Sequence, residues 1–401
     1  MTVDAAALRQ DLLAVVRGRG GAQDEAVAEA LLAVPRHVFV PEVTVEAAYR
    51  DDAIVTKRDG DGVPVSSSSQ PTIMAFMLDQ LGVAPGHRVL EIGAGTGYNA
   101  ALLAHLVGAS GTVVTVDIDG QVVDRARNGL TAAGYPQVTV AWGDGADGYA
   151  AAAPFDRIIA TAGVWDLAPA WLQQLAPGGR IVVPLELHGA QVSVAFEREN
   201  GHWVGRQPVA CGFMRLRGDF AGPGGIHVLD PTTGLRLAVG DDREVDAGAV
   251  SRAVAGPAVI QPTQVSDLRP ADASGLGFWL AITEPHSCTL SDEGHGSPVL
   301  ETALVQADGF CLTPGILEAT GIAVLGLRPA GACIAVEAHG YGPDGDRIAT
   351  SLAARVRAWD AAGRPDVGRL RITAYPPDVP CPDDGIVIAK AHTRLVIAIR
   401  P

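Results

Sequence analysis

The sequence is poor in lysine, cysteine and aromatic residues, and it has no long apolar run. Only Lys57 and Lys390 among its 30 basic residues are lysines, and aromatic residues make up 5%. The five cysteines are scattered without a CxxC pair, which disfavours structural zinc and a disulfide framework. No apolar stretch reaches the roughly 18 residues of a membrane span. The first residues also lack the pattern of a signal peptide, so we expect a soluble, cytoplasmic protein with no metal site and no membrane partner.

Positive charge is scarce as well. The chain has 45 acidic residues against 30 basic ones, a formal net charge of −15. It offers no basic stripe for a phosphate backbone, so we do not expect a nucleic acid as a partner. By contrast, 401 residues with 48% hydrophobic composition are enough for two or three domains with cores of their own.

Strand and helix patterns alternate through the first half of the chain. Helices are predicted at 5–17, 22–33 and 71–80, with a loop at 56–69. Strands are then predicted at 88–92, 111–117, 138–141, 155–161 and 180–185, with helices at 99–106, 120–133 and 168–175 between them. Such alternation predicts an α/β fold of the Rossmann-like type, a mostly parallel sheet with helices on both faces. Strands at 191–198 and 203–209 would add an antiparallel pair.

The second half of the chain has a different pattern. Residues 218–225 (GDFAGPGG) are the predicted linker, so we expect domains at 1–217 and 226–401. The second domain is predicted to be α+β, with one amphipathic helix at 347–361. Its predicted strands lie near 235–239, 277–283, 303–306, 334–339, 370–375 and 395–399. His286 and His295 flank a polar segment that we interpret as a loop rather than a metal site.

A glycine-rich turn follows the strand predicted at 88–92. The segment Val89–Tyr98 reads VLEIGAGTGY, and its glycines let the backbone approach a bound ligand closely. Tyr98 occupies the last glycine position of the GxGxxG pyrophosphate fingerprint, so that fingerprint is incomplete. Glu91, just before the glycines, would repel a pyrophosphate but suits a ligand with an ammonium group. This combination favours S-adenosylmethionine, which carries an α-ammonium and a sulfonium.

Two further acidic residues follow predicted strands. Asp117 ends the strand at 111–117, where a carboxylate can accept both ribose hydroxyls. Asp144, within Gly143-Asp144-Gly145, follows the strand at 138–141 and is placed for an adenine amino group. The alternative interpretation of these segments is a tight glycine turn whose acidic side chains only cap nearby backbone groups. The presence of Glu91, Asp117 and Asp144 together at strand ends favours the cofactor site.

Residues 30–215 carry several motifs in the order found in the protein-L-isoaspartate O-methyltransferase family. The matching segments are PRHVFVP at 35–41, AYRD at 48–51, SSQP at 68–71, LEIGAGTGYNAA at 90–101, FDRIIATA at 155–162 and LAPGGR at 175–180. The chain therefore resembles this family, and the resemblance implies an enzyme that methylates a peptide carboxylate with S-adenosylmethionine and releases S-adenosylhomocysteine.

The resemblance also implies roles for individual residues. Ser69 matches the active-site serine, although Ser67-Ser68 replaces the Thr-Ile that usually precedes it. The expected cofactor-binding residues are Ser68, Gln70, Glu91, Gly93, Gly95, Gly97, Asn99, Asp117, Ile118, Gly143, Asp144, Gly145 and Thr161. An alternative interpretation of Ser69 is a helix N-cap ahead of Pro71.

The long tail and the segment 211–218 (CGFMRLRG) resemble the FxLD-type branch of the family, which is associated with lanthipeptides and other ribosomally made, modified peptides. This resemblance implies a peptide substrate methylated at an aspartate, followed by a succinimide (aspartimide) and then aspartate or isoaspartate. The two alternatives are a general isoaspartate repair enzyme with an extra domain and a non-catalytic peptide-binding protein. The sequence does not indicate an oligomeric state.

Overall fold

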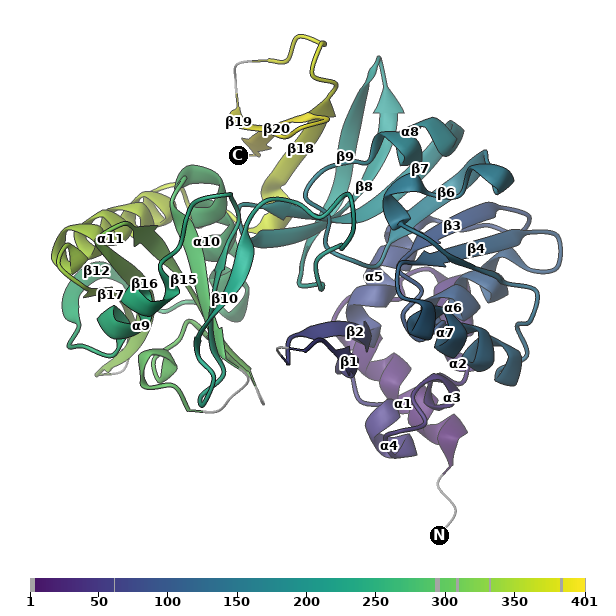
Figure 1. The fold of residues 1–401 in the computed structure, drawn as a ribbon, viewed down its shortest axis with the longest axis horizontal. Helices are drawn as coiled ribbons and strands as arrows, with labels where there is room; N and C mark the ends of the chain where they lie inside the picture. The colour runs from purple at the N-terminus through teal and green to yellow at the C-terminus, as the bar shows by residue number, and fades with distance from the viewer. Residues whose placement is uncertain are drawn as a thin grey trace.

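The computed structural model describes residues 4–60, 62–292, 296–307, 310–331, 333–382 and 385–400, which form two large sheets with helices packed against them (Figure 1). The first sheet has ten strands in the order β19-β20-β18-β9-β8-β7-β6-β3-β4-β5. Its parallel part consists of β3 (Arg88–Ile92), β4 (Thr112–Asp117), β5 (Thr139–Trp142), β6 (Phe155–Ala160) and β7 (Leu175–Leu187). The predicted mostly parallel α/β sheet is confirmed.

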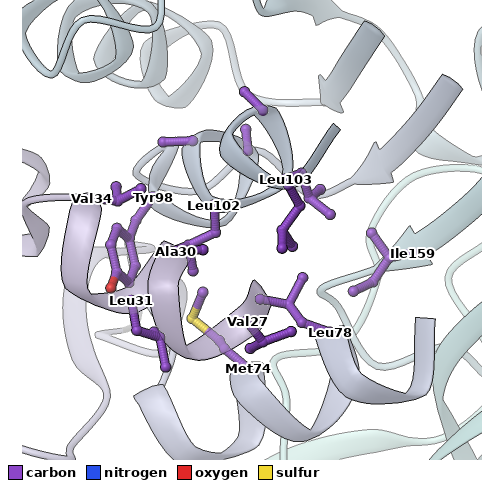
Figure 2. Close-up of a cluster of buried hydrophobic side chains, with 14 of the residues drawn as sticks. Val27, Ala30, Leu31, Val34, Met74, Leu78, Tyr98, Leu102, Leu103 and Ile159 are labelled. Atoms are coloured by element: carbon purple, nitrogen blue, oxygen red, sulfur yellow. The ribbon is translucent and has the colours of Figure 1, made fainter. Parts of the chain in front are cut away.

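Alternate residues of the parallel strands enter cores on opposite faces of the sheet. On β3, Val89 belongs to one buried cluster and Leu90 to the other, the pattern of a parallel sheet covered on both sides. The covering helices are α1 (Ala5–Gly18), α2 (Glu25–Ala33), α3 (Arg36–Phe39), α4 (Val45–Ala48), α5 (Pro71–Leu81), α6 (Tyr98–Val107), α7 (Gly120–Ala132) and α8 (Pro169–Gln174). Figure 2 shows the first core, where Leu31 of α2, Met74 of α5 and Leu102 of α6 lie close together.

The segment 56–69, which the sequence predicts as a loop, is largely a β-hairpin. Its strands β1 (Ile54–Arg58) and β2 (Pro64–Ser68) pair antiparallel with irregular register. The prediction is wrong because Gly, Asp and Ser dominate the segment and hide the short strands. The hairpin leads directly into α5. On one side of it lie the helices that cover the first sheet, and on the other side lies the second sheet (Figure 1).

The antiparallel strands β8 (Ala190–Glu199) and β9 (His202–Cys211) extend the first sheet as predicted. Three strands from the end of the chain then continue it: β18 (Leu370–Tyr375) pairs with β9, followed by β20 (Arg394–Ile399) and β19 (Ile386–Ala389). Residues 226–401, expected to form one α+β unit, are therefore divided between two sheets. Strand patterns alone do not reveal such pairing between residues far apart in sequence.

The second sheet has the order β10-β11-β13-β15-β16-β17-β12, with β14 paired to β15. Its strands are β10 (Gly225–Asp230), β11 (Leu235–Val239), β12 (Val259–Ser266), β13 (Ser287–Asp292), β14 (Val305–Ala307), β15 (Phe310–Glu318), β16 (Gly321–Ala330) and β17 (Cys333–Tyr341). The predicted long helix is present as α11 (Gly345–Ala361), and α9 (Ala247–Val254) is additional. Short 3₁₀ helices occur at Gly145–Asp147, Ala150–Ala152, Pro298–Leu300 and Val367–Arg369.

Two predictions for this region are wrong. The strand expected at 277–283 belongs to helix α10 (Pro270–Thr283), because a short apolar run fits a buried helix as well as a strand. Phe278 and Ile282 of this helix pack into the second core of the first sheet. The polar segment expected as a loop after His286 begins with strand β13, while His295 lies outside the described residues. In the described ranges, no helix is long and apolar enough to cross a membrane.

Candidate active site

A cavity of about 520 Å³ opens where the carboxyl ends of β3, β4 and β6 meet the end of the β1–β2 hairpin. Many of the residues expected to form the site line this cavity. They are Ser68, Ser69, Gln70, Glu91, Gly93, Gly95, Asn99, Asp117, Ile118, Gly145 and Thr161. The sheet edge therefore brings together residues that are spread over nearly 100 positions of the sequence, because the carboxyl ends of parallel strands share one edge.

The glycine-rich turn between β3 and α6 needs glycine at two positions for different reasons. Gly93 has φ of 99°, and a Cβ atom there would lie 2.9 Å from Thr161 Oγ1, a hydroxyl that donates to Gly93 O at 2.7 Å. Gly97 has φ of 87°, and its Cβ would lie 3.0 Å from Ala126 O of α7. Gly97 is not part of the cavity lining, so it permits close packing of α6 on α7 rather than close approach of a ligand.

Two buried polar side chains at the cavity have unused hydrogen-bonding capacity. Asn99 Nδ2 donates to Glu91 Oε1 at 2.7 Å, whereas Asn99 Oδ1 and Ser68 Oγ have no hydrogen-bond partner among the described residues. Burial raises the pKa of Glu91 to about 7, and hydrogen bonds from Thr115 and Asn99 offset part of this effect. Buried acceptors without partners are rare in folded proteins, so this end of the cavity fits a ligand that donates hydrogen bonds, such as an ammonium group.

Asp117 ends β4 with its carboxylate held by backbone groups. Oδ1 accepts from Asp119 N at 3.0 Å, and Oδ2 accepts from Gly95 N at 3.3 Å. Burial raises the pKa of Asp117, and these hydrogen bonds oppose the shift. A carboxylate has about four acceptor positions, so both oxygens retain capacity for hydroxyl donors in the cavity. Asp119 in turn binds Lys57 Nζ of β1 at 2.5 Å, which holds the hairpin beside the end of β4.

Gly143 and Asp144, predicted as cofactor contacts, are not part of the cavity lining. Asp144 Oδ1 accepts from Ala146 N at 2.8 Å and caps a 3₁₀ helix, and Oδ2 accepts from Asp219 N at 2.8 Å. Gly143 N donates to Asp117 O at 3.0 Å. The structure therefore gives Asp144 backbone partners, one of them in the predicted linker, and its contact with adenine stays a prediction.

The segment that covers one side of the cavity includes residues 211–217, which the sequence marks by their resemblance to the FxLD-type branch but does not place at the site. Residues 210–217, which we call the strap, comprise the last two residues of β9 and the six that follow, and all of them line the cavity. Gly163 N donates to Met214 O at 2.8 Å, and Leu216 N donates to Gly163 O at 2.8 Å, so the strap lies along the segment that follows β6. No local motif indicates this position, because the contact joins residues about 50 positions apart.

Ser69 does not act as the helix N-cap. Helix α5 begins at Pro71 with Gln70 as its N-cap, and Gln70 makes no side-chain cap. Thr72 N instead donates to Asp51 Oδ1 at 2.8 Å, so the aspartate of the AYRD segment satisfies the helix start. The capping interpretation of Ser69 is therefore wrong, and its half-buried side chain lines the cavity.

Arg36, to which the sequence analysis assigned no role, positions the segment that carries Ser69. Its guanidinium is fully buried and donates to Ser69 O at 3.1 Å and Ser68 O at 3.4 Å. It also donates to Ala48 O, Arg50 O and Asp52 O at 2.8, 3.0 and 2.9 Å. One side chain thus fixes two loops that meet at the cavity. In the sequence, a single arginine between apolar helix patterns is the signal that could have indicated this structural role of Arg36.

Comparisons with known proteins agree with this geometry. A sequence model described as protein-L-isoaspartate(D-aspartate) O-methyltransferase matches residues 7–220. The protein-L-isoaspartate O-methyltransferase of Methanopyrus kandleri is 40% identical over 213 residues, which cover 53% of this chain and 92% of that protein. The enzyme of the same name from Ignicoccus hospitalis is 40% identical over 178 residues, 44% of this chain and 82% of that protein.

One solved structure has the same fold. A protein-L-isoaspartate O-methyltransferase structure aligns over 98% of this chain and 99% of its own, with a TM-score of 0.51 and 22% identity. A Plasmodium falciparum relative in complex with S-adenosyl-L-homocysteine covers 52% of this chain and 98% of its own, with a TM-score of 0.46 and 20% identity. With a family model over more than half of its length, the chain belongs to the S-adenosylmethionine-dependent protein-L-isoaspartate(D-aspartate) O-methyltransferases.

Proposed function

We propose that this chain transfers the methyl group of S-adenosylmethionine to the side-chain carboxylate of an aspartyl or isoaspartyl residue in a peptide. The observation that carries the proposal is the shared cavity, in which Ser69 lies with Glu91 and Asp117. The polar end of this cavity has unpaired buried acceptors, and Ser69 adds a hydroxyl close to them. One cavity can thus hold a donor and an acceptor together, as direct transfer requires.

The residues present fit the cofactor. Glu91, Asn99 and Ser68 supply acceptors for the α-ammonium group, and Asp117 supplies a carboxylate for the ribose hydroxyls. The glycine-rich turn allows the backbone to lie against the ligand. When bound, S-adenosylmethionine supplies a methyl group that its sulfonium has already activated.

Ser69 then has a positioning task. A carboxylate with a pKa near 4 is already ionised at pH 7, so the site needs no general base to create the nucleophile. The Ser69 hydroxyl can donate one hydrogen bond to a carboxylate oxygen while the other oxygen attacks the methyl carbon. The protein contributes alignment and exclusion of water rather than covalent catalysis.

For the substrate, we propose a ribosomally made precursor peptide that is methylated at one aspartate. The resemblance of the strap and tail to the FxLD-type branch supports this choice, and residues 221–401 lie beyond the family match and provide a surface that could read the peptide. The backbone nitrogen that follows the ester attacks its carbonyl, methanol leaves and a succinimide forms. The alternative is general isoaspartate repair, in which the same ring lets water reopen the chain to aspartate.

Two substrates separate these alternatives. The full chain is incubated with S-adenosylmethionine and either an aspartyl peptide encoded next to its own gene or a short isoaspartyl peptide of unrelated sequence. We expect a gain of one methyl group on the first peptide, followed by loss of methanol, in mass spectrometry. Methylation of the isoaspartyl peptide alone would favour repair, and methylation of neither, by protein that binds the cofactor, would reject the proposed function.

Replacing Ser69 by alanine should lower kcat by roughly tenfold, the effect of losing one hydrogen bond that aligns the acceptor. The affinity for S-adenosylmethionine should stay within a few fold, because other residues supply the cofactor contacts. Single-turnover methylation and calorimetry measure the two quantities. Ser67→Ala, which changes a neighbouring serine of the same cavity, is the matched control. Equal turnover in Ser69→Ala and the wild type would remove Ser69 from the mechanism.

Cofactor binding should weaken as the pH falls through 7. Burial raises the pKa of Glu91 to about 7 in the free protein, so below that pH the carboxyl must lose a proton before it can pair with an ammonium group. We expect the affinity to fall roughly tenfold between pH 7 and pH 5.5. Calorimetry on the wild type and Glu91→Gln tests this, since the glutamine variant lacks this ionisation. Identical pH slopes in the two proteins would contradict the assignment.

A further inference from the structure

The second sheet contributes a side chain to the active-site cavity. Phe310, the first residue of β15, lines the same cavity as Ser69, and no other described residue beyond 217 does so. The residue is far from the methyltransferase motifs in sequence and lies outside the family match. The cavity is therefore completed by a part of the chain that the family match does not include.

Phe310 differs from other exposed apolar residues of the second sheet in its position at the cavity and not in its exposed fraction. Its exposed fraction is 41%, but Ile260 and Ile334 of the same sheet are exposed to 52% and 50%. Single exposed apolar side chains are ordinary on protein surfaces. Only Phe310 among these three lines the cavity, where a bound molecule can cover its ring.

Both polar and apolar side chains line the cavity. Glu91 and Asn99 are buried polar residues of the lining, and its apolar residues include Val65 of the hairpin, Phe213 of the strap and Phe310. Figure 1 shows the β1–β2 hairpin on the side of the first domain that faces the second sheet. An acceptor carboxylate that reaches Ser69 brings its peptide backbone with it, so side chains next to the aspartate come within reach of other residues that line the cavity, Phe310 among them.

We propose that Phe310 is a specificity-determining residue that binds an apolar side chain adjacent in sequence to the methylated aspartate. This inference rests on the proposed function, and it adds the chemical class of the peptide. Contact with an aromatic ring removes apolar surface from water and favours leucine, isoleucine or phenylalanine at that position over serine or glycine. The selection acts on binding of the peptide, because the ring does not touch the reacting carboxylate.

Two synthetic peptides test the proposal with the full chain. They have the same sequence around one isoaspartyl or aspartyl residue and carry either leucine or serine next to it. We expect the wild type to have a kcat/KM for the leucine peptide roughly fivefold above that for the serine peptide. Phe310→Ala should abolish this preference, mainly through a higher KM for the leucine peptide, and Phe310→Leu should keep most of it.

Ile260→Ala is the matched control, because Ile260 is an exposed apolar residue on β12, the edge strand that lies three strands away from β15 in the same sheet. It should discriminate between the peptides as the wild type does. Thermal unfolding checks that each variant is folded. An unchanged leucine preference in Phe310→Ala, or a wild type without any preference, would overturn the proposal.

A wild type that binds S-adenosylmethionine but methylates neither peptide would count against the proposed function rather than against Phe310. In that case the role of Phe310 is tested by binding alone. Fluorescently labelled leucine and serine peptides are titrated with protein saturated with S-adenosylhomocysteine. Tighter binding of the leucine peptide that is lost in Phe310→Ala supports the role of Phe310. Equal binding of both peptides by wild type and variant rejects it.

Discussion

Replacing Asp117 by alanine is expected to weaken the binding of S-adenosylmethionine by at least about tenfold. The carboxylate is held at the end of β4 by hydrogen bonds from Gly95 N and Asp119 N, so it is ordered before any ligand arrives. A hydrogen bond to a charged group contributes about 1.5–3 kcal/mol, and each 1.4 kcal/mol changes affinity about tenfold. Losing two bonds to the ribose hydroxyls therefore exceeds a tenfold effect even if water replaces part of the interaction.

Calorimetric titration with S-adenosylmethionine measures this effect. Asp117→Asn keeps the shape and one carbonyl acceptor, so its affinity should lie between those of the alanine variant and the wild type. Asp124→Ala is the control on the neighbouring helix, because the Asp124 side chain is exposed to 74% and pairs with Arg127 at the surface. Cofactor affinity in Asp117→Ala equal to that of Asp124→Ala would show that Asp117 does not contact the cofactor.

The parts of the fold that sequence analysis predicted correctly are those with local signals. The strands and helices between 88 and 185 follow one another with short connections, and parallel sheets have strongly apolar strands. The same reasoning located Glu91, the glycine turn and Asp117, because ligands bind at the carboxyl ends of such strands. Glu91, Asp117 and most of the glycine turn line one cavity, whereas Gly97, Gly143 and Asp144 do not.

The parts that it missed depend on contacts between distant residues. Strands β18 and β20 have clear strand patterns, but nothing in them indicates that β18 pairs with β9 rather than with the second sheet. Helix α10 has an apolar run that also fits a buried strand. Phe310 joins the cavity only because the second sheet lies beside the hairpin, so no motif near residue 310 could reveal it.

Glu186 of β7 connects the strap to a residue near the end of the chain. Arg215 pairs with Glu186 at 3.1 Å, and Lys390 Nζ donates to Glu186 O at 3.0 Å. Burial raises the pKa of Glu186 and lowers that of Lys390, while the neighbouring opposite charges oppose both shifts. The linker predicted at 218–225 therefore does not separate the two sheets completely in sequence, because residues 370–399 return to the first sheet.

Replacing Arg36 by methionine is expected to destabilise the protein by about 3–5 kcal/mol, since a buried guanidinium that serves several acceptors would be lost. Five backbone carbonyls from two loops accept its hydrogen bonds, and methionine offers none of these donors. Carbonyls left buried without a partner each carry a desolvation cost. We expect the melting temperature to fall by roughly 10 °C in a calorimetric scan.

Two further variants separate the loss of these hydrogen bonds from the loss of charge. Arg36→Lys retains the charge but cannot reproduce the planar fork, so it should recover only part of the stability. Arg50→Met removes an exposed arginine from the same region and should change the melting temperature little. A melting temperature for Arg36→Met close to that of Arg50→Met would contradict the role of Arg36. Because Arg36 holds the carbonyls of Ser68 and Ser69, Arg36→Lys should also lower turnover at temperatures where it is fully folded.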